Sequence, residues 1–170
     1  LCPHSHITAC DVHEHRVALI QKYKNRMHVP NVKAIKMDGT VFDESMQNRF
    51  DGVLVDAPCS CFGTYKKHPD VFLSRTDESE DEICKTQLEI LSNVARYVKK
   101  GGAMVYSTCT LFKKENDEVV QKFFASEQGN DFCLEKICGL KDVDGGKYVD
   151  NSGEIQILPH AEYAKLRRAK

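Results

Sequence analysis

Two cysteines of this chain stand directly after short apolar stretches. Residues 53–59 read VLVDAPC and residues 104–109 read MVYSTC, so Cys59 and Cys109 each follow a segment with the composition of a strand. A single cysteine in such a place is usually structural, and its reactivity requires a lowered pKa that a sequence does not reveal. Two cysteines that each follow a predicted strand, one of them close to Asp56, favour a site whose chemistry depends on a thiol nucleophile.

Three aspartates occupy comparable positions. Asp11, Asp38 and Asp56 each end a predicted strand or follow it shortly. Ligands of open α/β sheets bind beyond the carboxyl ends of the strands, so these carboxylates and the two thiols should share one crevice. For Asp11 or Asp38 taken alone, a turn former or helix N-cap is the stronger interpretation. In the functional interpretation, the carboxylate of Asp11 accepts hydrogen bonds from both hydroxyls of a nucleoside ribose. Asp38, with the neighbouring Gly39, contacts the adenine amino group.

The apolar periodicity predicts strands that alternate with helices. Strands are expected at residues 7–10, 32–35, 50–55 and 103–107, and helices at residues 12–27, 76–100 and 114–124. The tail is less regular, with residues 154–158 and 162–166 as a candidate closing strand pair. This alternation indicates an α/β fold with a mostly parallel sheet, covered on both faces, in a single domain.

The composition narrows the class of protein. The 170 residues carry a formal net charge of -1, so a general basic coat for nucleic acid is excluded and any such contact must be local. No apolar run approaches the roughly 18 residues of a membrane span, and no segment resembles a secretory signal. Eight cysteines without such a signal predict a reducing compartment and a soluble, cytoplasmic protein.

The cysteine spacing also raises the question of a structural metal site. Cys59 and Cys61 could combine with Cys133 and Cys138, but structural zinc sites usually have two similarly short knuckles. We therefore expect no metal. The other cysteines are expected to be ordinary buried small apolar residues: Cys2, Cys10, Cys84, Cys133 and Cys138.

Several motifs together resemble the RNA 5-methylcytosine methyltransferases. Residues 56–60 read DAPCS, residues 107–110 read STCT, and residues 66–70 between them read KKHPD. The resemblance runs almost continuously from about Ile7 to Phe124, is weaker after Phe124, and includes these further matches: DVHEHR at 11–16, KMDGT at 36–40, and Gln87 with Ile90 and Leu91. Within the family, the chain is most similar to the bacterial small-subunit ribosomal RNA enzymes of the Sun or Fmu type.

The resemblance implies a Rossmann-like methyltransferase fold with S-adenosylmethionine as cofactor. It places five residues around that cofactor: Asp11, Arg16, Asp38, Asp56 and Pro58. Without the resemblance, Arg16 would be interpreted as a solvated helix residue.

The family's first motif, a strand followed by a glycine-rich cofactor loop, is expected before Leu1. Residues 1–170 would then be the carboxy-terminal part of a single methyltransferase domain, with a sheet incomplete at its N-terminal side. The further strand would lie between the strands that end at Asp11 and Asp56. Because unpaired buried backbone groups are costly, the chain alone is expected to be inactive unless another segment fills the gap.

The implied reaction proceeds at carbon 5 of a cytosine in RNA, with ribosomal RNA as the expected substrate. Carbon 5 is a poor nucleophile until a group adds to carbon 6, and a thiolate is a strong yet reversible adduct former. On the resemblance, Cys109 forms that bond and Cys59 assists product release. Asp56 would stabilise the charge that develops near ring N3. Spacing alone does not decide which thiol attacks.

A cytosine in a paired stem is inaccessible, so the target base must be unstacked or single-stranded. Lys66 and Lys67, followed by His68, could contact nearby RNA phosphates. It is equally consistent with the sequence that they lie in a solvated loop without such a contact. Residues 61–63 read CFG where the family usually has a small, glycine-rich stretch, which leaves the shape of this loop open.

Three alternatives remain at this point. Transfer RNA is the nearest rival substrate. An inactive RNA-binding or assembly module would account for the absent cofactor loop. A thiol-dependent redox or hydrolytic enzyme has the least support, because the sequence contains no Cys-x-x-Cys motif.

Overall fold

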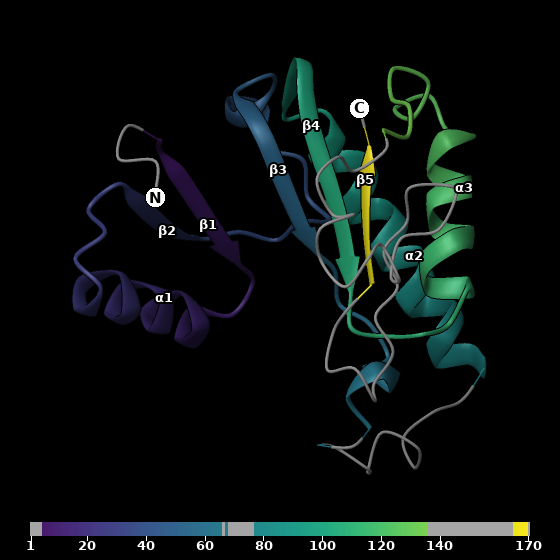
Figure 1. The fold of residues 1–170 in the computed structure, drawn as a ribbon, viewed down its shortest axis with the longest axis horizontal. Helices are drawn as coiled ribbons and strands as arrows, with labels where there is room; N and C mark the ends of the chain where they lie inside the picture. Colours follow the sequence, from purple (N-terminus) through teal and green to yellow (C-terminus); the bar gives the residue numbers. More distant parts are fainter. Residues whose placement is uncertain (1–4, 66, 68–76, 136–164, 170) are drawn as a thin grey trace, which may run out of the picture. The chain divides into compact units, whose positions relative to one another are not determined.

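The computed structural model describes residues 5–65, 67, 77–135 and 165–169. Its strands and helices (Figure 1) are β1 (Ile7–Asp11), α1 (Glu14–Arg26), β2 (Val32–Lys36), β3 (Phe50–Asp56), α2 (Asp77–Ala95), β4 (Val98–Thr108), α3 (Val119–Phe124) and β5 (Lys165–Ala169). Short 3-10 turns lie at Glu44–Met46 and Phe62–Thr64, and a π-helical turn at Lys114–Glu118 directly precedes α3. The chain divides into two compact units, residues 1–41 and 42–170.

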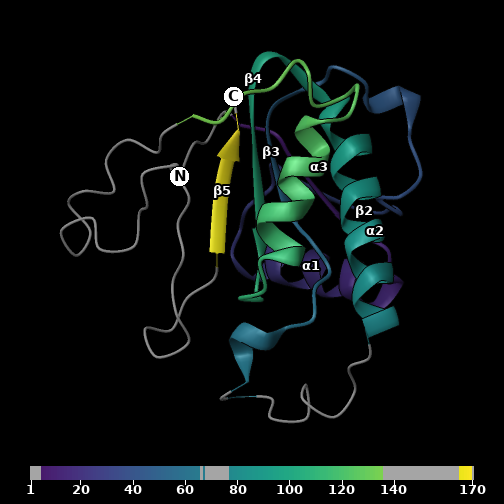
Figure 2. The same ribbon diagram turned by 90° about the vertical axis from the view of Figure 1, so that its right-hand side faces the viewer.

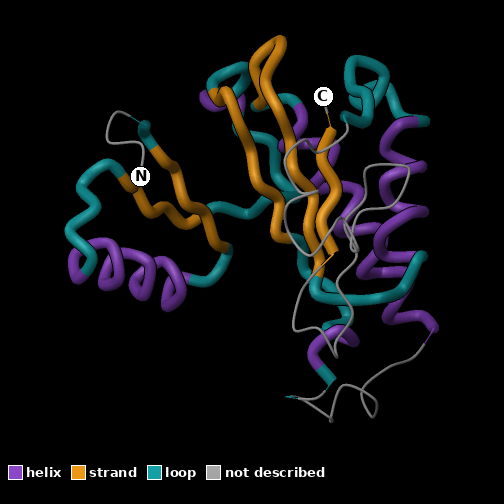
Figure 3. The backbone as a smooth tube through the Cα atoms, viewed as in Figure 1, coloured by secondary structure: helices purple, strands orange, loops and turns teal. Residues whose placement is uncertain are grey.

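In the first unit, β1 and β2 form a parallel pair that α1 connects (Figure 3). The register sets Asp11 beside Lys36, so both strands end at the same edge. α1 has Glu14 in its first turn and Lys24 and Arg26 in its last, an arrangement that suits the helix dipole. No residue of α1 is buried.

In the second unit, β3 and β4 run parallel, and β5 pairs with β4 in the antiparallel direction. α2 and α3 pack side by side on one face of this sheet (Figures 1 and 2). Val55 and Tyr106 are register partners that face these helices, and Met104 shares their face because side chains alternate along a strand. Leu54, on the opposite face, is 67% exposed.

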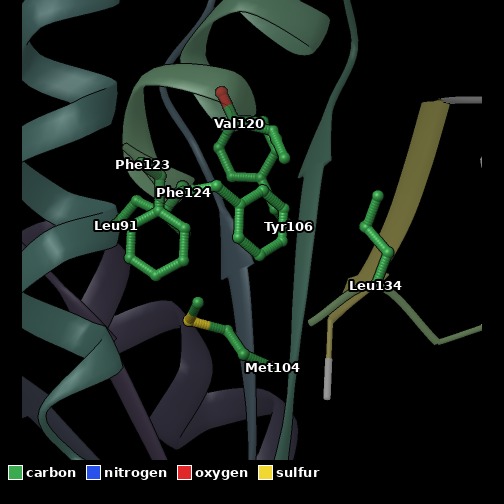
Figure 4. Close-up of a pocket in the computed structure, with 7 residues that line it drawn as sticks. All are labelled: Leu91, Met104, Tyr106, Val120, Phe123, Phe124 and Leu134. Carbon is green, nitrogen blue, oxygen red and sulfur yellow. The ribbon is translucent and has the colours of Figure 1, made fainter. Parts of the chain in front are cut away.

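The core of the second unit lies between β4, α2 and α3. Leu91, Met104 and Phe123, one from each element, are at most 2% exposed. They surround a small apolar pocket that Tyr106 and Val120 also line (Figure 4). Burying a side chain of this size stabilises a fold by roughly 1.5–3 kcal/mol. The packing therefore fixes α3, and the π-helical turn before it, against the strand that leads to Cys109.

The boundary between α2 and β4 corrects the sequence prediction. The apolar spacing predicts a helix through Val98 to residue 100, but α2 ends at Ala95 and β4 begins at Val98. Val98 pairs with Phe50, and the register shifts before the regular ladder begins at Gly52. A buried valine serves a strand as well as a helix, and spacing alone does not say which neighbour covers it.

The other strands and helices agree with the predicted ranges apart from residues at their ends. The predicted helix 114–124 is present, although its first turn is π-helical. Of the predicted closing strands, residues 154–158 lie outside the described residues, and the second, at 162–166, is only partly matched: β5 (Lys165–Ala169) overlaps it at residues 165 and 166 and pairs with β4. No helix in the described part of the chain is long and apolar enough to cross a membrane.

The parallel strands lie in two sheets, β1-β2 and β3-β4-β5, where the sequence predicts one mostly parallel sheet. Among the described residues, no strand pairs with the second edge of β1 or with the second edge of β3. These are the two strands between which the resemblance places a further strand. The α/β fold is therefore mostly parallel and its sheet is incomplete.

The predicted burial of the isolated cysteines is correct only in part. Cys84 of α2 is buried, but Cys10 and Cys133 are exposed. A small apolar residue is buried only where another layer covers it, and no residue of β1 is buried. Cys2 and Cys138 lie outside the described residues.

Candidate functional site

The polar residues of the first unit gather at the edge where β1 and β2 end. The backbone N–H of Met37 donates to the carbonyl oxygen of Asp11 at 3.0 Å, which continues the pairing to this edge. Asp11 Oδ1 accepts a hydrogen bond from the backbone N–H of His13 at 2.8 Å. Asp11 Oδ2 lies 3.6 Å from a guanidinium nitrogen of Arg16.

Asp38, two residues beyond β2, builds a second turn at this edge. Its Oδ1 accepts hydrogen bonds from the hydroxyl and the backbone N–H of Thr40, at 2.7 and 2.9 Å, and both bonds lower the pKa of Asp38. The turn-forming interpretation is thus correct for both Asp11 and Asp38. Each turn engages Oδ1 of a carboxylate that has two acceptor oxygens, so it is compatible with ligand binding.

In the second unit, the loops after β3 and β4 leave the sheet side by side. Asp56 is the register partner of Ser107, whose hydroxyl donates to Asp56 Oδ1 at 3.3 Å. The backbone N–H of Ala57 donates to the carbonyl oxygen of Ser107 at 3.0 Å. Beyond this point the Sγ atoms of Cys59 and Cys109 lie 3.0 Å apart. The exposed carboxylate of Asp56 and the two half-buried thiols therefore occupy one edge of the sheet.

A third thiol joins this pair. Cys61 has a φ angle of 59°, in the left-handed region, and its Sγ lies 3.4 Å from that of Cys109. The Sγ atoms of Cys59, Cys61 and Cys109 all lie within 4.8 Å of one another. The backbone N–H of Gly63 donates to the carbonyl oxygen of Cys109 at 2.8 Å, and a Cβ atom on Gly63 would overlap that oxygen.

The hydrogen bond between Cys59 and Cys109 shifts their pKa values in opposite directions. It lowers the pKa of Cys59 to about 7 and raises the pKa of Cys109. Burial by itself raises the pKa of both thiols. Either thiol can donate this hydrogen bond, and Sγ of Cys109 also lies 3.4 Å from Sγ of Cys61, so the two thiols titrate as a pair.

Glu115 fixes the loop that carries Cys59. Its side chain is 0% exposed, and its carboxylate accepts hydrogen bonds from the backbone N–H of Ser60 at 2.8 Å and from the Ser60 hydroxyl. The buried Gln87 amide of α2 donates to Glu115 Oε2 at 3.2 Å and to the carbonyl oxygen of Pro58 at 2.8 Å. The loop is thereby tied to α2 and to the π-helical turn.

Asn116 fixes the loop that carries Cys109. Its Oδ1 accepts a hydrogen bond from the hydroxyl of Thr108 at 2.6 Å, and its amide donates to the carbonyl oxygens of Thr110 and Phe112 at 3.3 and 2.7 Å. The hydroxyls of Ser60 and Thr110 lie 2.9 Å apart and connect the two loops. Neighbouring residues of the π-helical turn therefore hold both cysteine loops in register.

The model of the family described as 16S rRNA methyltransferase RsmB/F matches residues 1–165 of this chain. The chain belongs to this family.

Curated proteins of the RsmB/F family are similar over most of the chain. The probable ribosomal RNA small subunit methyltransferase B of Bacillus subtilis is 38% identical over 157 residues, which cover 91% of this chain. The ribosomal RNA small subunit methyltransferase B of Pectobacterium atrosepticum is 34% identical over 171 residues, which cover 96% of the chain. The chain spans 34% and 37% of the length of these two relatives.

Solved structures agree with this assignment. The crystal structure of PH0851 superposes with a TM-score of 0.84 at 27% identity, over 99% of this chain and 37% of that protein. NSun6 from Pyrococcus horikoshii shares the fold with a TM-score of 0.77, over 99% of this chain and 42% of that protein, at 21% identity. The chain therefore has the Rossmann-like α/β fold of methyltransferases, with an incomplete sheet.

The site residues predicted for this RsmB/F chain fall into one group in each unit. The first unit holds Asp11, Arg16 and Asp38, and the second holds Asp56, Pro58, Cys59 and Cys109. That both groups share one crevice stays a prediction. Lys66 lies outside the described residues, and the exposed Lys67 donates its backbone N–H to the carbonyl oxygen of Thr64 at 2.8 Å.

Sequence reasoning on this RsmB/F chain missed Cys61, Glu115 and Asn116. The Cys59-x-Cys61 spacing was a signal, but it was combined with Cys133 and Cys138, whereas the third thiol beside Cys59 and Cys61 is Cys109. Glu115 and Asn116 lie in a highly charged stretch that indicates a solvated helix start, and nothing in that stretch predicts that they turn inward.

Proposed function

We propose that the protein transfers the methyl group of S-adenosylmethionine to carbon 5 of a cytosine in RNA, through a covalent bond between Cys109 and carbon 6. The thiol pair carries this proposal. Cys59 and Cys109 lie 3.0 Å apart at one sheet edge, beside the carboxylate of Asp56. Membership of the family described as 16S rRNA methyltransferase RsmB/F supports a methyl transfer to RNA.

The two thiols have different tasks. Attack on carbon 6 requires Cys109 as a thiolate, and the Cys59 thiol, 3.0 Å away, is a neighbouring group that can exchange a proton with it. Addition of Cys109 turns carbon 5 into an enamine nucleophile. After methylation, loss of the carbon 5 proton and expulsion of Cys109 complete the turnover. Cys59, in contact with Cys109, assists this release.

Asp56 is proposed to stabilise charge on the same cytosine. Its carboxylate is exposed at the strand end, and the hydroxyl of Ser107 orients Oδ1. Near ring N3 of the cytosine, a carboxylic acid or carboxylate stabilises the charge that develops as the enamine forms.

When bound, S-adenosylmethionine supplies an electrophilic methyl group. The residues proposed to hold it are Asp11, Arg16, Asp38, Asp56 and Pro58. Asp11 and Asp38 fit this role, because their turns engage Oδ1 and each carboxylate has a second oxygen for ribose hydroxyls or the adenine amino group. The lowered pKa of Asp38 keeps it an acceptor at neutral pH.

The proposed substrate is small-subunit ribosomal RNA, following the names of the relatives in Bacillus subtilis and Pectobacterium atrosepticum. The net charge of -1 restricts phosphate contacts to local groups, of which Lys66 and Lys67 follow the Pro-Cys motif. The target cytosine is expected to be unstacked, because its carbon 6 face must reach Cys109.

A labelling assay tests the proposal. The full-length protein is incubated with methyl-labelled S-adenosylmethionine and either small-subunit ribosomal RNA or transfer RNA, and digested RNA is analysed for 5-methylcytosine. We expect label in ribosomal RNA with wild type and none with Cys109→Ala. Undiminished labelling by the variant would exclude Cys109 as the attacker. RNA binding without labelling of either RNA would favour an inactive binding module.

The role of Cys59 predicts a trapped intermediate. A Cys59→Ala variant keeps the Cys109 nucleophile but loses the group that assists its release, so the covalent protein–RNA adduct should accumulate. Denaturing gel electrophoresis with labelled RNA measures this adduct, and a Cys59→Ala, Cys109→Ala double variant is the control. Rapid turnover by Cys59→Ala without any adduct would contradict the assigned role.

A further inference from the structure

The proposed methyl transfer uses two of the three clustered thiols and gives Cys61 no task. Cys61 is nevertheless held in place. Its left-handed backbone conformation turns its side chain back towards Cys109, with an Sγ–Sγ separation of 3.4 Å. The backbone bond from Gly63 to Cys109 closes the same loop over the end of β4.

The spacing of the three sulfur atoms suits a soft metal ion. Zinc binds thiolates at about 2.3 Å, so two sulfur ligands of a tetrahedral site lie about 3.8 Å apart. In the cluster, Sγ of Cys109 lies 3.0 Å from that of Cys59 and 3.4 Å from that of Cys61, and all three lie within 4.8 Å. A small outward movement of the thiols would bring all three into ligand geometry.

The close spacing of the three thiols favours a bound cation over three thiolates without a compensating charge. Three thiols within 4.8 Å of one another, beside the loop that the Glu115 carboxylate holds, oppose the build-up of negative charge that would follow if all three lost their protons. A divalent cation removes that opposition, since it replaces thiol protons and compensates the thiolate charges. All three cysteines are half-buried, so an ion can reach them from solvent.

We propose that Cys59, Cys61 and Cys109 form a three-thiolate site for Zn²⁺, with the fourth coordination position open to water, and that the bound ion blocks methyl transfer. Binding breaks the S–H bonds of the protonated thiols, releases those protons to solvent and forms three Zn–S bonds. The block rests on the proposed function, because it follows from Cys109 being the attacking group. The metal site does not depend on that function.

Cobalt and zinc titrations of the untagged, reduced protein test the metal site without any activity measurement. We expect thiolate-to-Co²⁺ charge-transfer absorption together with the intense visible bands of tetrahedral Co²⁺, and loss of both on addition of Zn²⁺. In Cys61→Ser the Zn²⁺ affinity, measured against a chromophoric chelator, should fall roughly 100-fold or more, because loss of even an outer-shell partner of a metal ligand costs about 10- to 100-fold. The matched control is Cys133→Ser, an exposed cysteine away from the cluster, which should bind Zn²⁺ as wild type does.

Equal Zn²⁺ affinity of Cys61→Ser and Cys133→Ser, or Co²⁺ binding without thiolate charge transfer, would overturn the metal site. Activity is then compared as the ratio of methyl transfer with and without Zn²⁺. This ratio should be low for wild type, restored by a chelator, and close to one for Cys61→Ser at the same Zn²⁺ concentration. Tight Zn²⁺ binding with an unchanged ratio in wild type would overturn the block on Cys109.

Discussion

The loop that carries Cys59 depends on a buried carboxylate from another part of the chain. Glu115 is fully buried and accepts two hydrogen bonds from Ser60, the neighbour of Cys59, and one from Gln87. A buried hydrogen-bond donor that loses its acceptor destabilises the fold, because the free energy of its desolvation is no longer compensated. At the scale of single residues, the placement of the reactive sulfur atoms is therefore a property of a carboxylate on another element.

Replacing Glu115 by alanine tests this dependence. Glu115→Ala leaves the Ser60 N–H and hydroxyl without their acceptor and removes one partner of Gln87, so we expect the free energy of unfolding to fall by about 2 kcal/mol or more. Urea denaturation measures the change. Glu118→Ala, an exposed position of the same π-helical turn, is the control and should stay within about 0.5 kcal/mol of wild type. Equal stability of the two variants would show that the hydrogen bonds of Glu115 contribute nothing net.

The sequence identifies the reactive residues better than their supports. Cys59, Cys109 and Asp56 could be selected because each ends an apolar strand, and the parallel pairing of β3 and β4 brings them to one edge. Glu115 could not, because a glutamate among charged residues is ordinarily solvated and its burial depends on partners from other elements. The approach of Cys61 to Cys59 and Cys109 was not predicted, because spacing along the chain does not show which thiols meet in space.

At the scale of elements, the loop after β3 lies directly against the end of β4. The closest approach is at Gly63, whose backbone N–H donates to the carbonyl oxygen of Cys109 and whose missing Cβ leaves room for that oxygen. A side chain at this position would push the two loops apart. The separation between the Cys59 and Cys109 thiols thus depends on a glycine in the stretch where this chain departs from the family's usual loop.

Gly63→Ala should separate the loops. The added methyl group overlaps backbone atoms of Cys109, so we expect a stability loss of about 1–3 kcal/mol and, because reacting groups are misplaced, a roughly 100-fold slower single-turnover methyl transfer. Gly52→Ala is the control, since no atom lies within 4 Å of a Cβ there, and it should leave methyl transfer unchanged. Wild-type rates in Gly63→Ala would mean that the loop approach does not position the thiols.

Apolar periodicity predicts some helices and strands of this chain and fails for others. The strands ending at Asp11 and Asp56 were predictable, because short apolar runs next to turn-forming residues have few alternatives. The end of α2 was not, because Val98 fits the apolar face of the helix and also pairs with Phe50 in the sheet. The π-helical turn at Lys114–Glu118 was predicted as ordinary helix, since its register depends on which residues it buries.

At the scale of the whole chain, net charge limits how these residues could contact the proposed RNA substrate. Lysine and arginine total 24 and aspartate and glutamate total 25, so the chain has no surplus of positive charge to spread over a phosphate backbone. Affinity for single-stranded RNA falls with salt by a slope of about 0.7 per phosphate contacted. We therefore expect a shallow salt dependence that a few local lysines produce.

A double variant measures how much of that dependence comes from the loop after the Pro-Cys motif. Replacing Lys66 and Lys67 by alanine should weaken binding of single-stranded RNA and reduce the slope of log affinity against log salt by about 1.4, the loss of two phosphate contacts. Lys99→Ala is the control, because Lys99 already pairs with Asp51 at 2.7 Å, and its slope should remain that of wild type. Fluorescence anisotropy over a series of salt concentrations gives both slopes. If the double variant and Lys99→Ala kept the same slope, these two lysines would be solvated loop residues, and the phosphate contacts would have to come from elsewhere on the molecule.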